Sequence, residues 1–217
     1  MNIKHFRGAL VGIIACLPLI AVADLEEVAR LYSENYERAA AAQNAGDYSG
    51  AEEWHRTNLT LIESTPGVPP DVRVQARYNL ASVIMYQGRL SKAESILDEA
   101  QGILDANPQI DPTIKAYFLL NSGGLKGKQH ELKAAEELLE QGLAILEDTT
   151  GLRDAGAAGA EIELARIQVQ LGKLKKAESN YRHALWVLSG LGFTKSTPLF
   201  EEAIDEHEEL LDRLGIK

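Results

Sequence analysis

Three short motifs in this 217-residue sequence resemble catalytic or ligand-binding patterns, and each lacks a feature that the chemistry needs. His130-Glu131 and His207-Glu208 begin like the helical zinc-protease motif, but neither is followed by the second histidine one helical turn later. The run over residues 123–128 is rich in glycine and lysine, yet it lacks the spacing of a phosphate-binding loop. No nucleophile, general base or metal-binding set stands at a spacing that suits catalysis. We therefore predict a protein that is not an enzyme and that uses no cofactor or metal ion.

The composition limits the partners that the protein can bind. The chain contains 22 Lys and Arg against 32 Asp and Glu, and this acidic balance argues against nucleic acid, which binds basic surfaces. Acidic runs such as residues 201–209 lack the alternating oxygen ligands of a calcium loop, so we interpret them as solvated helix faces. A hydrophobic content of 45% and a charged content of 25% are typical of a folded domain.

The first 23 residues have the pattern of a secretory signal peptide. Lys4 and Arg7 precede an apolar run over residues 8–20, which is too short for a comfortable membrane span. Small residues then lead to a cleavage site between Ala23 and Asp24. We predict that residues 1–23 are removed and that the mature chain does not insert into a membrane.

Two alternatives to cleavage stay open, namely an uncleaved anchor and a lipid on Cys16, since residues 13–16 loosely resemble a bacterial lipobox. Removal of residues 1–23 would leave 194 residues with a net charge of −12 and without the single cysteine. An exported chain without disulfides fits a bacterial periplasm better than a eukaryotic secretory route. We therefore predict a periplasmic protein of a bacterium.

A period of 42 residues runs through the rest of the chain. An Ala-Glu pair recurs at this interval, and a turn residue stands five positions before each alanine. The alanines are Ala51, Ala93, Ala135 and Ala177, and the turn residues are Gly46, Gly88, His130 and Gly172. Each copy contains two apolar patterns of helical spacing, and no stretch alternates as a strand does, so we expect an all-α fold. A single helix pair cannot bury both apolar faces, whereas stacked pairs can bury a continuous core.

The second copy resembles the tetratricopeptide repeat (TPR) at Leu80-Ala81, Ile84, Gly88, Ala93 and Leu97, and the fourth copy resembles it in the same way. The resemblance covers about residues 30–190, and the period is similar to that of the longer, kinesin light chain-like variety. It implies a right-handed α-solenoid of four helix-turn-helix repeats and a C-terminal capping helix. The expected segments are 1–23, the repeats at about 24–67, 68–110, 111–150 and 151–196, and the cap at 197–217.

The chain departs from the TPR pattern at one position of every copy. The bulky aromatic residue expected early in the first helix is replaced by Asn35, Arg77, Leu119 and Glu161. The third copy also has His130 where the other copies have a glycine at the turn. The last segment, 197–217, has one apolar face and one acidic face, which suits a cap; an acidic docking helix is the alternative.

In the family that the chain resembles, the first helices line a concave groove that binds a peptide. Helical spacing places a polar, amide-rich set of side chains on one side of those helices. Gly124 and Gly127 are expected to widen this groove, although the same face could simply be solvated and its asparagines could bond to neighbouring helices. The groove residues that we predict are Tyr78, Asn79, Ser82, Tyr86, Tyr117, Asn121, Gly124, Lys128, Arg166 and Gln170.

The resemblance and the missing catalytic motifs together predict a non-catalytic scaffold or adaptor of the periplasm. It would bind a peptide segment or a partner protein in the concave TPR groove. The alternative is a structural module that dimerises or stacks end to end within an exported complex, so a homodimer is a second expected form.

Overall fold

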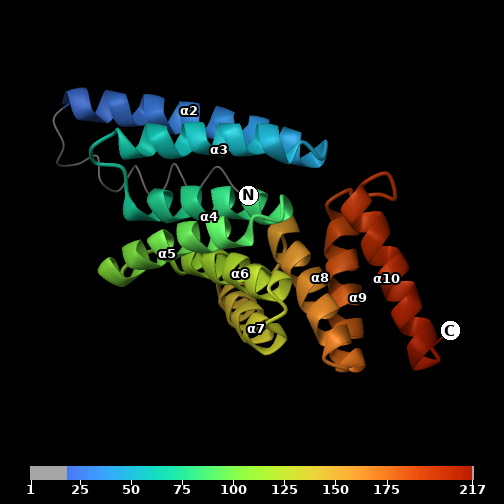
Figure 1. Cartoon of the computed structure of the whole chain (residues 1–217). Helices are drawn as coiled ribbons and strands as arrows, with labels where there is room; N and C mark the ends of the chain where they lie inside the picture. Colours follow the sequence, from blue (N-terminus) through green and yellow to red (C-terminus); the bar gives the residue numbers. More distant parts are fainter. Residues whose placement is uncertain (1–18, 217) are drawn as a thin grey trace. The chain divides into compact units, whose positions relative to one another are not determined.

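The computed structural model describes the backbone of residues 19–216 and the side chains of residues 25–216 (Figure 1). Within this part of the chain the regular structure is helical, with no strand, as the repeat pattern predicts. Consecutive helices form helix-turn-helix pairs. The first helices of the pairs are α2 (Leu19–Asn44), α4 (Pro70–Tyr86), α6 (Pro112–Lys128) and α8 (Ala155–Gln170); the second helices are α3 (Tyr48–Glu63), α5 (Leu90–Ala106), α7 (Leu132–Thr149) and α9 (Leu174–Gly190); α10 (Pro198–Leu214) follows them.

Most of the predicted signal segment lies outside the described residues, which begin at Leu19. The bond between Ala23 and Asp24, where we expect cleavage, lies in the first turns of α2. No helix in the described part of the chain is both long and apolar enough to cross a lipid bilayer. Export and cleavage therefore stay predictions from the sequence.

The same turn closes all four helix pairs. Its central residue has a positive φ, of 75° at Gly46 and Gly88 and of 73° at Gly172, where glycine is unstrained. His130 takes the equivalent place in the third pair with a φ of 63°. In each turn the next residue donates its backbone N–H to a carbonyl five positions earlier, as in a Schellman motif. These bonds are Asp47 to Ala42, Arg89 to Ile84, Glu131 to Lys126 and Lys173 to Gln168, at 2.8–3.2 Å.

The recurring alanine explains why the helices of a pair lie close together. Ala51, Ala93, Ala135 and Ala177 have no exposed surface, and all of them stand in the first turn of a second helix. A methyl group at this place lets two helix backbones approach, and a larger side chain would hold them apart. The period of the sequence is therefore the period of the helix contacts.

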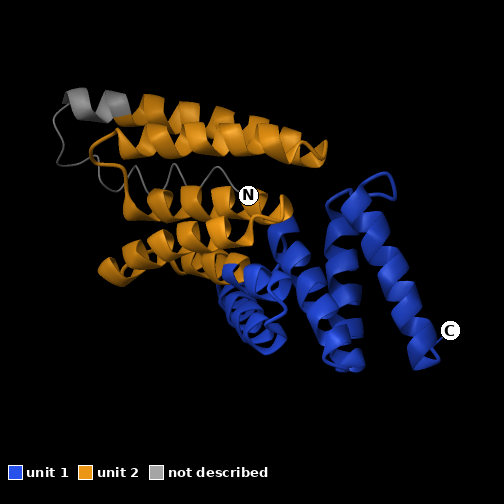
Figure 2. Cartoon of the chain, viewed as in Figure 1, with its two compact units in different colours: residues 1, 122–217 blue, residues 2–121 orange. Residues whose placement is uncertain are grey.

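The chain divides into two compact units, with the boundary inside α6 between Asn121 and Ser122 (Figure 2). In the N-terminal unit, Leu25, Tyr32, Ile62 and Val72 belong to a core that joins α2, α3 and α4. In the C-terminal unit, a second core joins α8, α9 and α10. Each unit thus buries apolar surface between successive helices.

Helix α10 completes the core of the C-terminal unit. Phe200, Ala203 and Leu210 are buried in the same cluster as Tyr181 and Leu188 of α9. The opposite face of α10 is acidic and exposed. This division between a buried and a charged face is the one that a capping helix requires.

Buried polar pairs occupy the position where the TPR pattern has an aromatic residue. In the first pair of helices, Asn35 Nδ2 donates to Asn58 Oδ1 at 3.0 Å, and both side chains are buried. In the second pair, the buried Arg77 contacts Glu63 of α3 at 2.5 Å and Glu99 of α5 at 3.2 Å. A buried polar group is tolerated when it finds such partners, so these copies replace an aromatic contact by hydrogen bonds.

The fourth pair of helices carries the opposite arrangement at the equivalent positions. Buried Glu161 of α8 lies 2.8 Å from Nδ1 of His183 on α9. Burial raises the pKa of the Glu161 carboxyl and the nearby Glu147 adds to this effect, whereas the contact with His183 opposes it. The fourth pair thus has the acidic Glu161 where the second pair has Arg77, and it has His183 where the second pair has Glu99.

Candidate peptide-binding surface

Tyrosines from three first helices gather on one face of the N-terminal unit. The rings of Tyr78 on α4 and Tyr117 on α6 have centroids 6.3 Å apart, and Tyr36 of α2 lies 6.1 Å from the His55 ring. Tyr78 is only 3% exposed, and burial raises the pKa of its hydroxyl well above the ordinary value. The structure thus places Tyr78 in the core rather than on the groove surface, because the neighbouring helices cover its ring.

The Asn79 side chain also contacts protein. Its Nδ2 atom is buried and makes no hydrogen bond of ordinary geometry, and the same holds for the Tyr78 hydroxyl. Burial raises the pKa of Tyr32 and the charge of Tyr36 adds to this, whereas the Asn79 amide acts in the opposite direction. The Asn79 amide nitrogen is therefore covered by protein rather than exposed in an open groove.

Asn121 uses its amide within its own helix. Its Nδ2 donates to the carbonyl oxygen of Tyr117, one turn earlier, at 2.8 Å. That N–H is therefore not offered to a ligand in this conformation. Asn79 and Asn121 do not form the pair of equivalent amide groups that the period of the sequence predicts.

Tyr86 is the predicted groove residue with the most exposed ring. It stands at the end of α4, is 55% exposed, and stacks on Tyr48 with centroids 5.1 Å apart and planes 5° apart. Gln87 donates to the Tyr48 carbonyl oxygen at 2.9 Å and to Glu52 at 3.0 Å, which fixes the backbone on both sides of the ring pair. Ser82, one turn before Tyr86, is half-buried. The accessible part of the predicted surface is thus its edge at the helix turns.

In the C-terminal unit, the glycines of α6 have different surroundings. A Cβ atom at Gly127 would lie 3.0 Å from Ile167 Cδ1, so this glycine lets α6 approach α8 and does not widen a groove. A Cβ atom at Gly124 would meet nothing within 4 Å. Lys128 and Gln170 are exposed, at the ends of α6 and α8.

The Arg166 side chain forms ion pairs with acidic residues of α10. Its Nε lies 2.9 Å from Glu206 Oε2, and its Nη2 lies 3.2 Å from Glu202. Tyr181 donates to the same Glu206 carboxylate at 3.1 Å. Burial lowers the pKa of Arg166, but the contact with Glu206 outweighs this and raises it. The predicted receptor for an acidic ligand therefore already has acidic partners within the chain.

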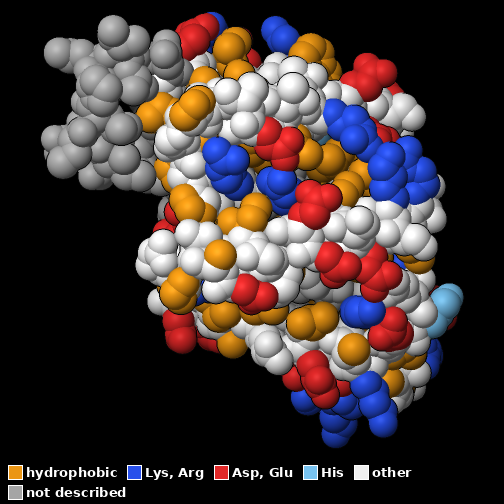
Figure 3. Space-filling model, turned by 60° about the vertical axis from the view of Figure 1, so that its left-hand side comes forward, with side chains coloured by type: hydrophobic (Ala, Val, Ile, Leu, Met, Phe, Trp, Pro, Cys, Tyr) orange, Lys and Arg blue, Asp and Glu red, His pale blue; other side chains and the backbone are white. Residues whose placement is uncertain are grey.

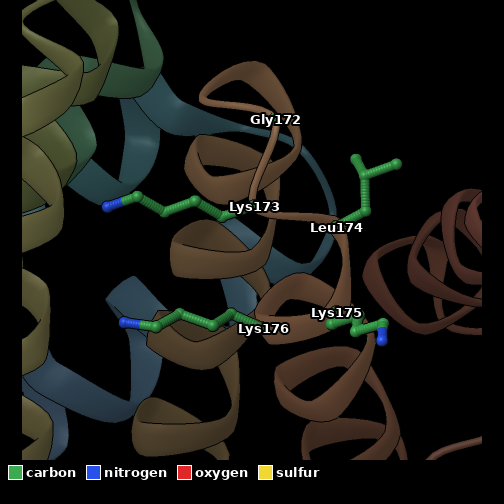
Figure 4. Close-up of a pocket in the computed structure, with 5 residues that line it drawn as sticks. All are labelled: Gly172, Lys173, Leu174, Lys175 and Lys176. Atoms are coloured by element: carbon green, nitrogen blue, oxygen red, sulfur yellow. The ribbon is translucent and has the colours of Figure 1, made fainter.

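A pocket of about 470 Å³ lies where the turn after α8 leads into α9, and the sequence did not indicate it. The ammonium groups of Lys173 and Lys176 extend to one side of this segment, and Lys175 points away from them (Figure 4). Lys173 pairs with Glu136 and Lys176 pairs with Glu140 at 3.2 Å. These ion pairs join α9 to α7. The ammonium groups that could bind an anion are therefore already paired with carboxylates of the chain.

The two zinc-protease half-motifs lie among residues that do not gather into a metal site. Between residues 25 and 216, no group of three or more His, Cys, Asp or Glu side chains could hold a metal ion. His207 of the second zinc-protease half-motif has its Nε2 3.7 Å from Glu178, on the neighbouring helix α9. On the face shown in Figure 3, acidic and basic side chains occur together with scattered hydrophobic ones.

Comparisons with known proteins establish the fold. No protein-family model matches the sequence, and no curated protein matches it. Among solved structures, BtubC (BKLC) from P. vanneervenii is similar over 99% of this chain and 85% of its own, with a TM-score of 0.66 and 16% identity. A putative kinesin light chain from Podosopora anserina with nearly identical TPR-like repeats is similar over 84% of this chain and 86% of its own, with a TM-score of 0.57 and 17% identity.

A third similar structure is aspartyl phosphate phosphatase F from Bacillus subtilis. It matches 97% of this chain with a TM-score of 0.58 and 19% identity, and this chain spans 55% of its length. Such identities establish the fold alone. The chain is an all-helical protein of TPR-like helix-turn-helix repeats.

Proposed function

We propose that this chain is a non-catalytic scaffold of a bacterial periplasm that binds an extended segment of a partner protein. The contact surface is the shared face of α2, α4 and the first part of α6, with Tyr86 as its anchor. One observation carries this proposal: the Tyr86 ring is exposed and stacked on Tyr48, while Tyr32 and Tyr78 of the same face are buried. A ring that is already held in place loses little freedom on binding, and tyrosine is enriched among residues that dominate binding energy.

The neighbours of Tyr86 suit a polar, extended ligand. The Ser82 hydroxyl lies one turn away on the same face of α4 and offers both a donor and an acceptor to a peptide backbone. The half-buried rings of Tyr36 and Tyr117 extend the aromatic surface along the unit. The TPR-like fold supports this use, because stacked helix pairs present extended binding surfaces.

The location in the periplasm rests on the sequence of residues 1–23. Its basic start, short apolar run and small residues before Asp24 support cleavage by a signal peptidase. Intact mass spectrometry of the exported protein tests this directly. A mature chain that begins at Asp24 supports the proposal, and a retained Met1 or a lipid-bearing Cys16 overturns it.

Photo-crosslinking in living cells tests the binding surface. A photoreactive amino acid at Ser82 should give a specific crosslinked partner band, and adding Tyr86→Ala should remove that band because the anchor is lost. The same amino acid at Ser95, which is exposed on the second helix α5 of this unit, serves as the matched control.

Two results would count against this surface. Equal crosslinking from Ser82 and Ser95 would mean that contacts are non-specific. A band at Ser82 that survives Tyr86→Ala would mean that Tyr86 is not the anchor. Thermal unfolding of Tyr86→Ala should be measured in parallel, since an exposed ring is expected to contribute little to stability.

A further inference from the structure

Helix α9 exposes a stripe of side chains that the other second helices do not have. Lys175, Ser179, Arg182 and Trp186 are spaced by four, three and four residues, so they share one face of the helix, and all are exposed. Trp186 is 68% exposed and the Arg182 side chain is 67% exposed. We call these four residues the α9 stripe. The equivalent residues are Lys133, Glu137, Glu140 and Ala144 on α7, Ser91, Ser95, Asp98 and Gly102 on α5, and Ser49, Glu53, Arg56 and Thr60 on α3.

The α9 stripe therefore differs from all of its equivalents at Trp186, which stands where α3 has Thr60, and it differs from α7 and α5 in charge as well. On α7 and α5, the position of Arg182 holds a carboxylate, and the position of Trp186 holds alanine or glycine. Arg182 is bonded to Glu178 of its own helix at 3.0 Å, an exposed pair that contributes little to stability. Repeat packing does not require an outward tryptophan, so its presence indicates a contact outside the folded unit.

Helix α10 carries an acidic stripe with the same spacing. Glu201, Asp205, Glu208 and Asp212 are also separated by four, three and four residues, and all are exposed. We call these residues the α10 stripe. Two helical stripes of equal length and opposite charge can lie against each other with carboxylates opposite cations.

Both stripes face away from α8. On α9, Asn180 and His183 make the contacts to α8, with Gln168 and Glu161, and neither belongs to the α9 stripe. On α10, the contacts to α8 come from Glu202 and Glu206, which lie outside the α10 stripe. The two stripes are thus accessible together on the hairpin formed by α9 and α10.

Exposed apolar side chains also occur along the same hairpin and at its ends. Five large hydrophobic residues are exposed in the described part of the chain, and only Tyr86 lies in the N-terminal unit. The other four are Trp186, Leu191, Leu199 and Ile216. An exposed tryptophan beside complementary charges is typical of a protein interface.

We propose that the α9–α10 hairpin is a dimerisation surface, on which the α9 stripe of one copy contacts the α10 stripe of a second copy. A two-fold axis makes each contact twice, because the hairpin carries both halves of the interaction. This self-complementarity favours a second copy over a foreign acidic segment, which would use only the α9 stripe. The proposal is independent of the peptide-binding surface in the N-terminal unit.

Charge reversal tests the pairing of the stripes. The protein recovered from the periplasm after expression of the full chain should form dimers in analytical ultracentrifugation at high concentration. Lys175→Glu with Arg182→Glu should weaken the dimer at least about tenfold, and so should Asp205→Lys with Asp212→Lys, because each places like charges opposite each other twice. An equimolar mixture of these two variants should form a heterodimer, since both contacts are complementary again.

Matched variants on other helices separate this effect from net charge. Lys92→Glu with Lys133→Glu makes the same change in net charge at exposed positions of α5 and α7, and it should leave the dimer intact. Circular dichroism melting of each variant checks that it is folded. A wild-type protein that stays monomeric overturns the proposal, even if it binds an acidic peptide through Trp186. Reversed variants that still dimerise, or a mixture that does not pair, overturn it as well.

Discussion

Glu52 of α3 accepts a charged hydrogen bond from Arg89, the residue before α5, with 2.7 Å between Oε1 and Nη2. The equivalent pair in the C-terminal unit joins Glu136 of α7 to Lys173, the residue before α9. In both cases a carboxylate in the second helix of one repeat binds a cation at the turn of the next repeat. These pairs fix how successive repeats stack within each unit.

The Glu52 pair should stabilise the N-terminal unit. Burial raises the pKa of Glu52, but bonds from Arg89, Arg56 and Gln87 outweigh it and lower the pKa to about 2. We expect Glu52→Gln to lower the free energy of unfolding by about 1–3 kcal/mol, because the buried acceptor loses its charge and its bonds to two arginines become weaker. Urea unfolding at pH 7 measures this, and Glu53→Gln on the exposed side of α3 is the control. Equal effects of both changes would contradict the assignment.

A glycine at the turn of the third repeat should make the protein more stable. His130 has a positive φ at the place where the other three turns have glycine, and its side chain is exposed. We expect His130→Gly to raise the free energy of unfolding by about 1 kcal/mol, because the left-handed conformation strains a residue with a Cβ atom. Gly88→His should have the opposite effect in the second repeat. A His130→Gly variant that melts at or below the wild-type temperature would contradict this reading of the turn.

His55 should make stability depend on pH. It is buried, and burial lowers its pKa from 6.5 to about 4. The unfolded chain therefore binds a proton between about pH 6.5 and pH 4 that the folded chain does not bind, so acidification favours unfolding in this range. The contribution of His55 is complete above pH 6.5 and falls by roughly 3 kcal/mol as the pH drops to about 4.

Urea unfolding of wild type and His55→Gln between pH 7 and pH 4 measures this contribution. The glutamine variant should lose less stability across the range, although it is expected to be less stable at pH 7. His130→Asn, which removes an exposed histidine, should follow the wild-type dependence. Parallel curves for wild type and His55→Gln would show that His55 is not the group responsible.

Helix α10 should be required for the C-terminal unit. Removal of residues 198–217 would uncover the cluster around Tyr181, Ala184 and Leu188 and would leave Arg166 without Glu206 and Glu202. We expect aggregation or a clearly lower melting temperature, because a solenoid needs a polar end. Removal of residues 215–217 alone, beyond the end of α10, is the control. A shortened protein that does not aggregate and melts unchanged would show that α10 is not a cap.

The groove residues show how far the period of the sequence can predict a surface. Adding 42 to a residue number identifies the equivalent position on the next first helix, so the period predicts that Asn79 and Asn121 lie on one face, with Tyr78 at or near it. The period does not say which neighbouring side chain reaches that position. Tyr78 is covered by adjacent helices, and the Asn121 amide binds its own helix.

The sequence by itself determined the all-helical class, the positions of the turns and the close helix contacts at the recurring alanines. These features depend on local patterns: helical spacing of apolar residues, a left-handed turn residue and a small side chain at a fixed place. Only the tertiary structure decided which polar residues are used inside the fold. Arg166 meets Glu206, Glu161 meets His183, and Gly127 meets Ile167 across distances of 22 to 40 residues in the sequence. Such contacts depend on how packed helices bring side chains together, and a pattern within one helix does not contain that information.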